Sequence, residues 1–202
     1  IVWTLLAVAE AKCRMRLLVT TDSDEVARIA RHLGAEVIPR PESLAQDDSP
    51  TEPALVHALE CGEVSPQDVV VFLQPTSPVR LNGTVDRAIL EFSLGDADSS
   101  VGVVRQSPFL WRGPVSDAQP DYDIDNRQRR QDFDVQSRLF RATGSVYLFR
   151  CGPFVEAGNR IHGRSRLFVM QDVEGIDVDA PEDLALAAVI LNSLKGSAYE
   201  NQ

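Results

Sequence analysis

The stretch LLVTTDSDEVARIARHLGAEVIPR, residues 17–40, decides the fold. It opens with the short apolar and β-branched run of a buried strand. Residues 23–35 then have the pattern of a helix: Ser23 can cap its start, acidic residues fill its first turn and Gly34 can end it. Residues 35–40 read as a second short strand. A strand, a helix and a strand in this order predict a right-handed crossover between parallel strands.

The same alternation extends along most of the chain. Residues 1–10 have a helix-like pattern, and further helices are expected at 48–62, 82–94 and 181–194, the last opening at Pro181. Strands are expected at 68–78, 99–106, 144–150, 167–172 and 175–179. We therefore predict an α/β fold with a doubly wound, mostly parallel, Rossmann-like sheet. The 202 residues are enough for a single domain, 1–202.

The segment 107–140 interrupts this alternation. It is polar, rich in proline and aspartate, and then abruptly basic, with three arginines in NRQRRQD, residues 126–132. Such a segment does not form a strand–helix unit, so we interpret it as an arm inserted into the domain. The arginines suit bidentate binding of carboxylate or phosphate, but the flanking acidic residues could simply neutralise them.

Composition excludes several classes of partner. A net charge of −10 argues against a nucleic-acid backbone as partner, and no apolar run reaches the roughly 18 residues of a membrane-spanning helix. The apolar start lacks a basic leader, so we expect no secretory signal. The three scattered cysteines show no metal-binding or disulfide spacing. These features are typical of a cytoplasmic protein.

Two aspartates alternate with apolar residues in GIDVDAPEDL, residues 175–184. In a strand, Asp177 and Asp179 would share one face, where two carboxylates repel unless a cation lies between them. Carboxylates with substrate phosphates are how proteins hold Mg²⁺. The alternative is that both acids are solvated or cap the helix at Pro181. In the same way, the polar end of LQPTSP, residues 73–78, could bind a ligand or form an ordinary proline-stiffened turn.

Four stretches, taken in order, resemble the acylneuraminate cytidylyltransferases and their relatives that activate other 2-keto-3-deoxy sugar acids. These stretches are residues 19–51, LQPTSPVR at 73–80, RRQDFD followed by TGSVYLF, and LFVMQDVEGIDVDAPEDL at 167–184. The resemblance implies transfer of CMP from CTP to a sialic-acid-like sugar acid, with release of pyrophosphate. The alternatives are a related nucleotidyltransferase for Kdo or another sugar, and a non-catalytic member of the family.

The resemblance also implies roles for individual residues. Asp177 and Asp179 would hold Mg²⁺, and Asp179 and Arg130 are the candidate catalytic residues. The nucleotide would contact Arg40, Ser49 and Thr51. The candidate residues for the sugar acid or the phosphates are Gln74, Arg127, Arg130, Gln131 and Thr143, the last in the place of a family asparagine.

Two further expectations follow from the resemblance. Family members are usually homodimers, and the segment 107–140 corresponds to their dimerisation arm, with Phe109, Trp111 and Phe133 as candidate apolar anchors. The family also begins with a strand and a glycine-rich phosphate-binding loop, whereas this sequence starts at a helix. We therefore expect the natural protein to be longer.

Overall fold

The computed structural model describes residues 1–133 and 138–199, without the side chains of Arg130 and residues 195–199. The α-helices are α1 (Val2–Ala9), α2 (Asp24–His32), α3 (Thr51–Cys61), α4 (Thr84–Leu94), α5 (Cys151–Ala157) and α6 (Pro181–Tyr199). The strands are β1 (Leu18–Thr21), β2 (Glu36–Pro39), β3 (Val69–Phe72), β4 (Ser99–Gln106), β5 (Trp111–Arg112), β6 (Gln119–Pro120), β7 (Leu139–Arg150) and β8 (Ser165–Val169). Short 3₁₀ turns are η1 (Glu42–Leu44), η2 (Val115–Asp117), η3 (Arg130–Asp132) and η4 (Asp172–Gly175).

The parallel pairing of the first two strands and the helix between them are confirmed. Strands β1 and β2 pair in parallel, with Leu18 opposite Glu36, and α2 connects them. The Ser23 hydroxyl accepts a hydrogen bond from the Val26 backbone N–H at 3.3 Å, which is the expected cap. Gly34 has a φ of +83°, so the chain leaves the helix in a conformation that favours glycine.

The larger sheet has the strand order β3-β7-β4-β8. Strands β3, β4 and β8 run in the same direction, whereas β7 is antiparallel to both of its neighbours. The mostly parallel sheet is therefore confirmed, with β7 as a reversed strand. The reversal has a simple cause: β4 and β7 are joined by the arm, which brings the chain straight back, and not by a crossover helix.

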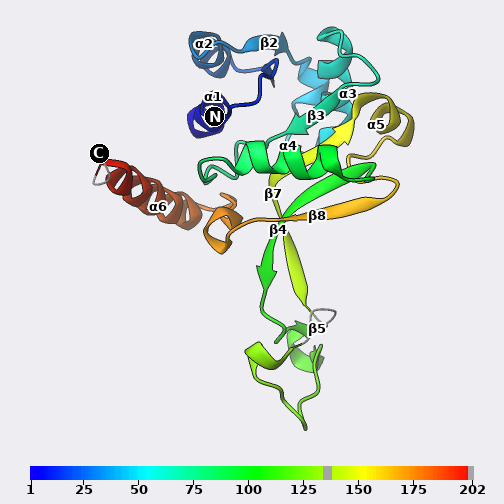
Figure 1. The fold of residues 1–202 in the computed structure, drawn as a ribbon, viewed down its shortest axis with the longest axis vertical. Coiled ribbons are helices and arrows are strands. Elements are labelled where there is room, and N and C mark those ends of the chain that lie inside the picture. Colours follow the sequence, from blue (N-terminus) through cyan, green and yellow to red (C-terminus); the bar gives the residue numbers. More distant parts are fainter. Residues whose placement is uncertain (134–137, 200–202) are drawn as a thin grey trace.

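Helices cover both faces of this sheet (Figure 1). On one face, Ala88 and Phe92 of α4 pack with Leu148 and Phe168 of the sheet. On the other face, buried residues of α3 and α5 pack with Tyr147, Phe149 and Val101. The two-sided covering is the doubly wound arrangement expected from the alternation of strands and helices.

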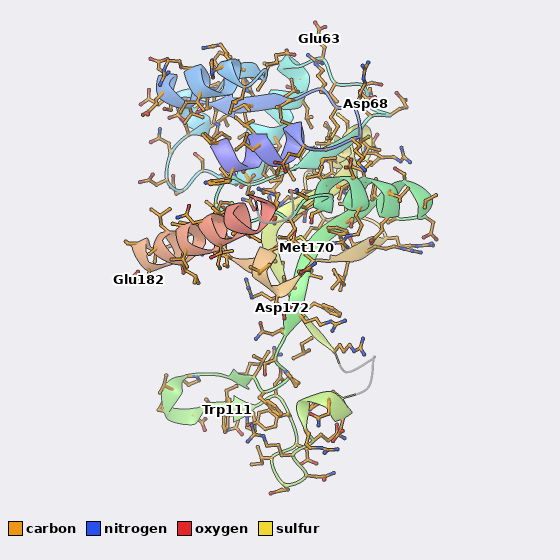
Figure 2. All side chains as sticks on the ribbon, turned by 60° about the vertical axis from the view of Figure 1, so that its left-hand side comes forward. Glu63, Asp68, Trp111, Met170, Asp172 and Glu182 are labelled. Carbon is orange, nitrogen blue, oxygen red and sulfur yellow. The ribbon has the colours of Figure 1, made fainter. Side chains whose placement is uncertain are left out.

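The inserted arm leaves the body as a two-stranded ribbon formed by the ends of β4 and β7 (Figure 1). At its tip, β5 pairs with β6, and four aromatic rings (Phe109, Trp111, Tyr122 and Phe133) meet edge to face at 5.2–6.2 Å between centroids. Figure 2 shows Trp111 well away from the sheet. The arm thus has a small apolar centre of its own.

The prediction of a strand at residues 175–179 is wrong. Residues 176–179 form no strand, because η4 occupies the positions before them and α6 begins directly after them. A single backbone bond, from Val178 N–H to the Thr76 carbonyl at 2.8 Å, holds this segment across the end of β3. Helix α5 was not anticipated from the sequence. No helix in the described part of the chain is both long and apolar enough to cross a membrane.

Candidate active site

Three segments meet just beyond the carboxyl end of β3. Gln74 follows that strand, Gly144 lies within β7, and Asp177 follows η4. Gly144 has a φ of +69°, and a Cβ placed on it would lie 2.7 Å from Gln74 Oε1 and 3.3 Å from Asp177 Oδ2. An amide oxygen and a carboxylate oxygen therefore lie close to the same glycine, where a side chain would collide with them. Ligands of open α/β sheets bind at this edge, outside the carboxyl ends of the strands.

Ser77 links its own segment to the other two through hydrogen bonds. It is fully buried, and its hydroxyl lies 2.8 Å from the Thr143 carbonyl oxygen and 3.1 Å from Asp177 Oδ1. A hydroxyl has one proton, so Ser77 donates to one of these acceptors at a time. Because Oδ1 of Asp177 is engaged there, its Oδ2 is the oxygen that lies next to Gly144.

Arg80 supports the site from the interior of the protein. Its guanidinium is buried and donates to the Ser145 carbonyl at 2.7 Å, to the Gln74 carbonyl at 2.8 Å and to the Thr4 hydroxyl at 3.1 Å. Burial lowers the pKa of Arg80 to about 10, and the negative charges of Glu174 and Asp177 oppose that shift. Arg80 thus fixes Gln74 beside β7 and supplies positive charge beneath the acids.

The Thr143 hydroxyl points into the sheet. The register of β4 and β7 shifts here: from Val101 to Val103 of β4 the partners change from Tyr147 to Ala142. Within this bulge, the buried Thr143 hydroxyl donates to the Gly102 carbonyl at 3.1 Å and accepts from the Ser145 N–H at 3.2 Å. The hydroxyl is therefore used for the bulge, which in turn sets the position of Gly144.

The candidate nucleotide residues lie on the neighbouring part of the fold. Arg40 follows β2 and donates from Nη2 to the Thr20 carbonyl at 2.6 Å. Ser49 Oγ accepts from the Gln46 N–H at 3.1 Å, and Thr51 is the first residue of α3. Arg40 therefore lies at the carboxyl end of the β1–β2 pair, and Thr51 at a helix N-terminus.

The arm carries the other candidates. The guanidinium of Arg127 lies over the Phe109 ring, 4.3 Å from its centroid, and 5.8 Å from that of Tyr122. Gln131 is exposed in η3. The side chain of Arg130 is outside the described residues. The structure therefore places Arg127 and Gln131 in the arm and not beside Gln74 and Asp177 of the same chain.

Asp179 and Asp177 do not share a strand face as the sequence suggested. Asp179 is exposed, and its backbone N–H donates to Asp183 Oδ2 at 3.2 Å, where Asp183 caps the start of α6. Its carboxylate is two residues beyond Asp177 on an extended segment. Within the described residues, no cluster of three or more histidine, cysteine or acidic side chains could hold a metal unaided.

The oxygen atoms over Gly144 nevertheless fit a hard cation. Mg²⁺ is usually bound by one or two carboxylates together with substrate phosphates, and does not need a complete protein cage. Asp177 Oδ2 is a carboxylate oxygen next to Gly144, and Gln74 Oε1 is a neutral oxygen close to the same glycine. These donors suit Mg²⁺ and give no reason to expect a softer metal.

Comparison with known proteins identifies relatives. The N-acylneuraminate cytidylyltransferase of Escherichia coli is 28% identical over 98% of this chain. The chain is similar in sequence to N-acylneuraminate cytidylyltransferases. The CMP-N,N'-diacetyllegionaminic acid synthase of Legionella pneumophila is 26% identical over 93% of the chain and is covered to 83% of its own length. No family profile matches the chain.

Coverage differs between these relatives. The chain spans 48% of the Escherichia coli cytidylyltransferase and 42% of the one from Oncorhynchus mykiss, which is 27% identical. Hence the chain corresponds to about half the length of these two proteins and to most of the Legionella pneumophila protein.

Solved structures agree on the fold. A CMP:2-keto-3-deoxy-manno-octonic acid synthetase complexed with CTP superposes with a TM-score of 0.68 and 14% identity, over 96% of this chain and 87% of that one. A 4-diphosphocytidyl-2C-methyl-D-erythritol synthase superposes with a TM-score of 0.65 and 14% identity, over 94% and 88% of the two chains. At this identity the likeness establishes the α/β fold alone.

The structure gives three residues of the site roles that the sequence did not indicate, and Ser77, a possible ligand contact in the sequence, binds Thr143 and Asp177 instead. Ser77 and Arg80 lie inside the quoted stretch LQPTSPVR, where nothing local shows that they are buried or which segments they join. Gly144 lies in TGSVY and becomes informative only through its positive φ and its neighbours. In each case the signal is a contact between segments far apart in the sequence.

Proposed function

We propose that the protein transfers CMP from CTP to a sialic-acid-like 2-keto-3-deoxy sugar acid and releases pyrophosphate. The observation that carries the proposal is the meeting of Gln74 Oε1 and Asp177 Oδ2 over Gly144, at the ligand-binding edge of a nucleotidyltransferase-like fold. The sequence relatives named as cytidylyltransferases and as a CMP-sugar synthase support the reaction class.

The reaction forms one bond and breaks another. The anomeric hydroxyl oxygen of the sugar acid attacks the α-phosphorus of CTP, the bond from that phosphorus to the bridging oxygen breaks, and the hydroxyl proton leaves. Because phosphoryl transfer depends mainly on positioning and charge neutralisation, the protein has to hold two anionic substrates in line. We assign the triphosphate to the space beside Asp177 and the sugar acid to the side of Gln74.

The remaining candidates take supporting roles in this proposal. Arg40, Ser49 and Thr51 contact the cytidine part, at the carboxyl end of the β1–β2 pair and the start of α3. Arg127, Arg130 and Gln131 contact the sugar acid or the phosphates of CTP from the arm, and Asp179 takes up the hydroxyl proton. The contribution of Thr143 comes through its backbone carbonyl and the bulge that it stabilises.

Mg²⁺ is the proposed cofactor, held by Asp177 and Asp179 together with the triphosphate. When bound, it would neutralise charge on the phosphates and on the departing pyrophosphate. Two residues of the chain prepare Asp177 for this role. Ser77 hydrogen-bonds one of its carboxylate oxygens, and the positive charge of Arg80 interacts with its negative charge.

The arm supports a homodimer. In a single chain Arg127 and Gln131 belong to the projecting arm, so a second copy is the simplest way to bring them over a site. Exposed apolar side chains on the arm, namely Trp111, Val115 and Ile124, are available for that contact. We also propose a cytoplasmic location, with which the three free cysteines are compatible.

The test is an assay of pyrophosphate release by the full-length protein with CTP and Mg²⁺. The acceptors are N-acetylneuraminic, legionaminic and pseudaminic acids, Kdn and Kdo, each with a no-acceptor control. We expect release with one or a few of these acids, and its loss with EDTA and in Asp179→Ala. A folded protein that is inactive with the whole panel would favour the non-catalytic alternative.

A further inference from the structure

A second carboxylate, fully buried, lies three residues before Asp177. Glu174 Oε1 accepts hydrogen bonds from the Thr84 hydroxyl at 2.6 Å and from the Leu81 N–H at 3.0 Å. Its Oε2 accepts from the Gln171 N–H at 3.0 Å, and the Gln171 side chain accepts from the Glu174 N–H to complete a capping box. Both oxygens contact only donors, which suits a carboxylate.

These bonds fasten the turn η4 to the start of α4. The turn is also held from the other side, because Arg141 Nη2 donates to the Gly175 carbonyl at 2.8 Å. A Cβ at Gly175 would lie 2.7 Å from a Val104 methyl group, so the chain passes close against β4 there. Only Ile176 separates this clamped turn from Asp177, whose carboxylate meets Ser77. The position of Asp177 is therefore set by Glu174 at one end and by Ser77 at the other.

Glu174 also balances charge. The guanidinium of Arg80 is buried and interacts electrostatically with both Glu174 and Asp177. With both acids charged, Glu174 offsets part of the positive charge of Arg80, which leaves more of the negative charge of Asp177 for a cation. Without the charge of Glu174, Arg80 would be neutralised by Asp177 alone, and Asp177 would attract a cation less strongly.

We propose that Glu174 is a positioning residue that aims Asp177 at a divalent cation and leaves its charge available for that cation. The proposal rests on the assignment of Asp177 as a metal ligand under the proposed function and names a residue outside that assignment. Residues that orient metal ligands without touching the metal commonly change metal affinity by about 10–100-fold when substituted.

The experiment measures Mn²⁺ affinity of the full-length protein with saturating CTP and without the sugar acid, from the enhancement of water proton relaxation by protein-bound Mn²⁺. The variants are Glu174→Gln, Asp177→Asn and, as a matched control, Glu156→Gln, which removes an exposed acidic charge on α5. We expect Asp177→Asn to lose binding, Glu174→Gln to weaken it about tenfold or more, and Glu156→Gln to bind as the wild type does. Circular dichroism and thermal melting report on folding.

If Glu174→Gln does not fold, a second pair of variants tests the same role of Glu174. Thr84→Val removes the hydroxyl that binds Glu174 but keeps the shape and the charge, whereas Thr84→Ser keeps the hydroxyl. We expect a smaller loss of Mn²⁺ affinity in Thr84→Val and none in Thr84→Ser.

The outcomes separate this inference from the proposed function. If Asp177→Asn loses Mn²⁺ while folded Glu174→Gln binds as the wild type does, the role of Glu174 is overturned and the metal site stands. Equal affinities of Thr84→Val and Thr84→Ser overturn the role of Glu174 if Glu174→Gln does not fold. If Asp177→Asn keeps full Mn²⁺ affinity, the metal assignment and this inference both fail.

Discussion

Gly144 shows at the scale of a residue why the site needs particular side chains. Its φ of +69° is costly for any residue with a Cβ, and that Cβ would collide with Gln74 and crowd Asp177. The neighbouring Ser77 and Arg80 hold the same two residues in place through the hydrogen bonds already described. The absence of a side chain at Gly144 therefore lets Gln74 and Asp177 approach the same point of β7.

The substitution Gly144→Ala tests this. The left-handed backbone should cost about 1–2 kcal/mol of unfolding free energy, and the added methyl group should in addition displace Gln74 or Asp177. The matched control is Gly158→Ala, because Gly158 has a φ of +62° with nothing within 4 Å of its Cβ position. Urea unfolding should show a loss in both variants. Mn²⁺ binding should fall only in Gly144→Ala, and a similar affinity in the two variants would refute the collision.

Helix α4 shows at the scale of an element how a distant segment is attached. Asp86, in its first turn, accepts backbone hydrogen bonds from Lys12 at 3.0 Å and from Cys13 at 2.9 Å, and so ties the chain after α1 to α4. These N–H groups lower the pKa of Asp86 below its ordinary value of 3.8. A carboxyl group with a lowered pKa stabilises the folded state above its unfolded pKa and loses that contribution as the pH falls through the folded one.

We therefore predict a pH-dependent effect of Asp86→Asn. The wild type should be more stable than the variant above about pH 5, and the difference in unfolding free energy should shrink as the pH falls below the ordinary carboxyl pKa of 3.8. Urea unfolding between pH 3 and pH 7 measures this. Asp47→Asn, at an exposed position, is the control. A difference that stays constant over this range would contradict the electrostatic explanation.

Elements with a local signature were predictable, whereas those set by distant contacts were not. A pattern of a few residues was enough to predict some elements. Examples are the cap at Ser23, the glycine at Gly34 and the β-branched run of β4. In contrast, the apolar alternation of residues 175–179 predicted a strand, but Glu174 and Pro181 place a turn before it and a helix after it. The reversed direction of β7 follows from the arm, which has no periodic pattern that fixes its path.

The candidate site was also predictable only in part. Asp177 and Gln74 were expected to be functional, and the structure brings them together over Gly144. The common strand face expected for Asp177 and Asp179 does not form, and their joint binding of Mg²⁺ stays a prediction that rests on the resemblance. Ser77, Arg80 and Glu174 act through contacts with residues far away in the sequence, so no local pattern identifies them.

At the scale of the whole molecule, the arm projects from the body and carries exposed apolar side chains at its tip (Figures 1 and 2). Its own aromatic cluster fixes the tip as a unit, so this surface is presented in a defined shape. An exposed apolar surface is typical of a site of protein–protein contact, and we propose that a second copy occupies it.

Charged substitutions on the arm test the dimer. We expect Val115→Lys and Ile124→Lys each to weaken self-association about tenfold or more, because a buried lysine would lose its solvation. Leu94→Lys is the matched control, since Leu94 is an exposed apolar residue on α4. Sedimentation equilibrium measures the dissociation constants. A wild-type protein that is monomeric at micromolar concentration, or equal effects of all three variants, would contradict the proposal.

The most direct test of the account compares CMP-sugar formation by the wild type, Asp177→Asn and Asp172→Asn at saturating CTP, sugar acid and Mg²⁺. Asp172 is exposed at the start of η4, where Figure 2 labels it, and serves as the control for loss of a nearby charge. We predict a loss of about 100-fold for Asp177→Asn, equal to about 2.7 kcal/mol of transition-state stabilisation, and little change for Asp172→Asn. Wild-type activity in a folded Asp177→Asn would contradict the central claim that the chemistry takes place over Gly144.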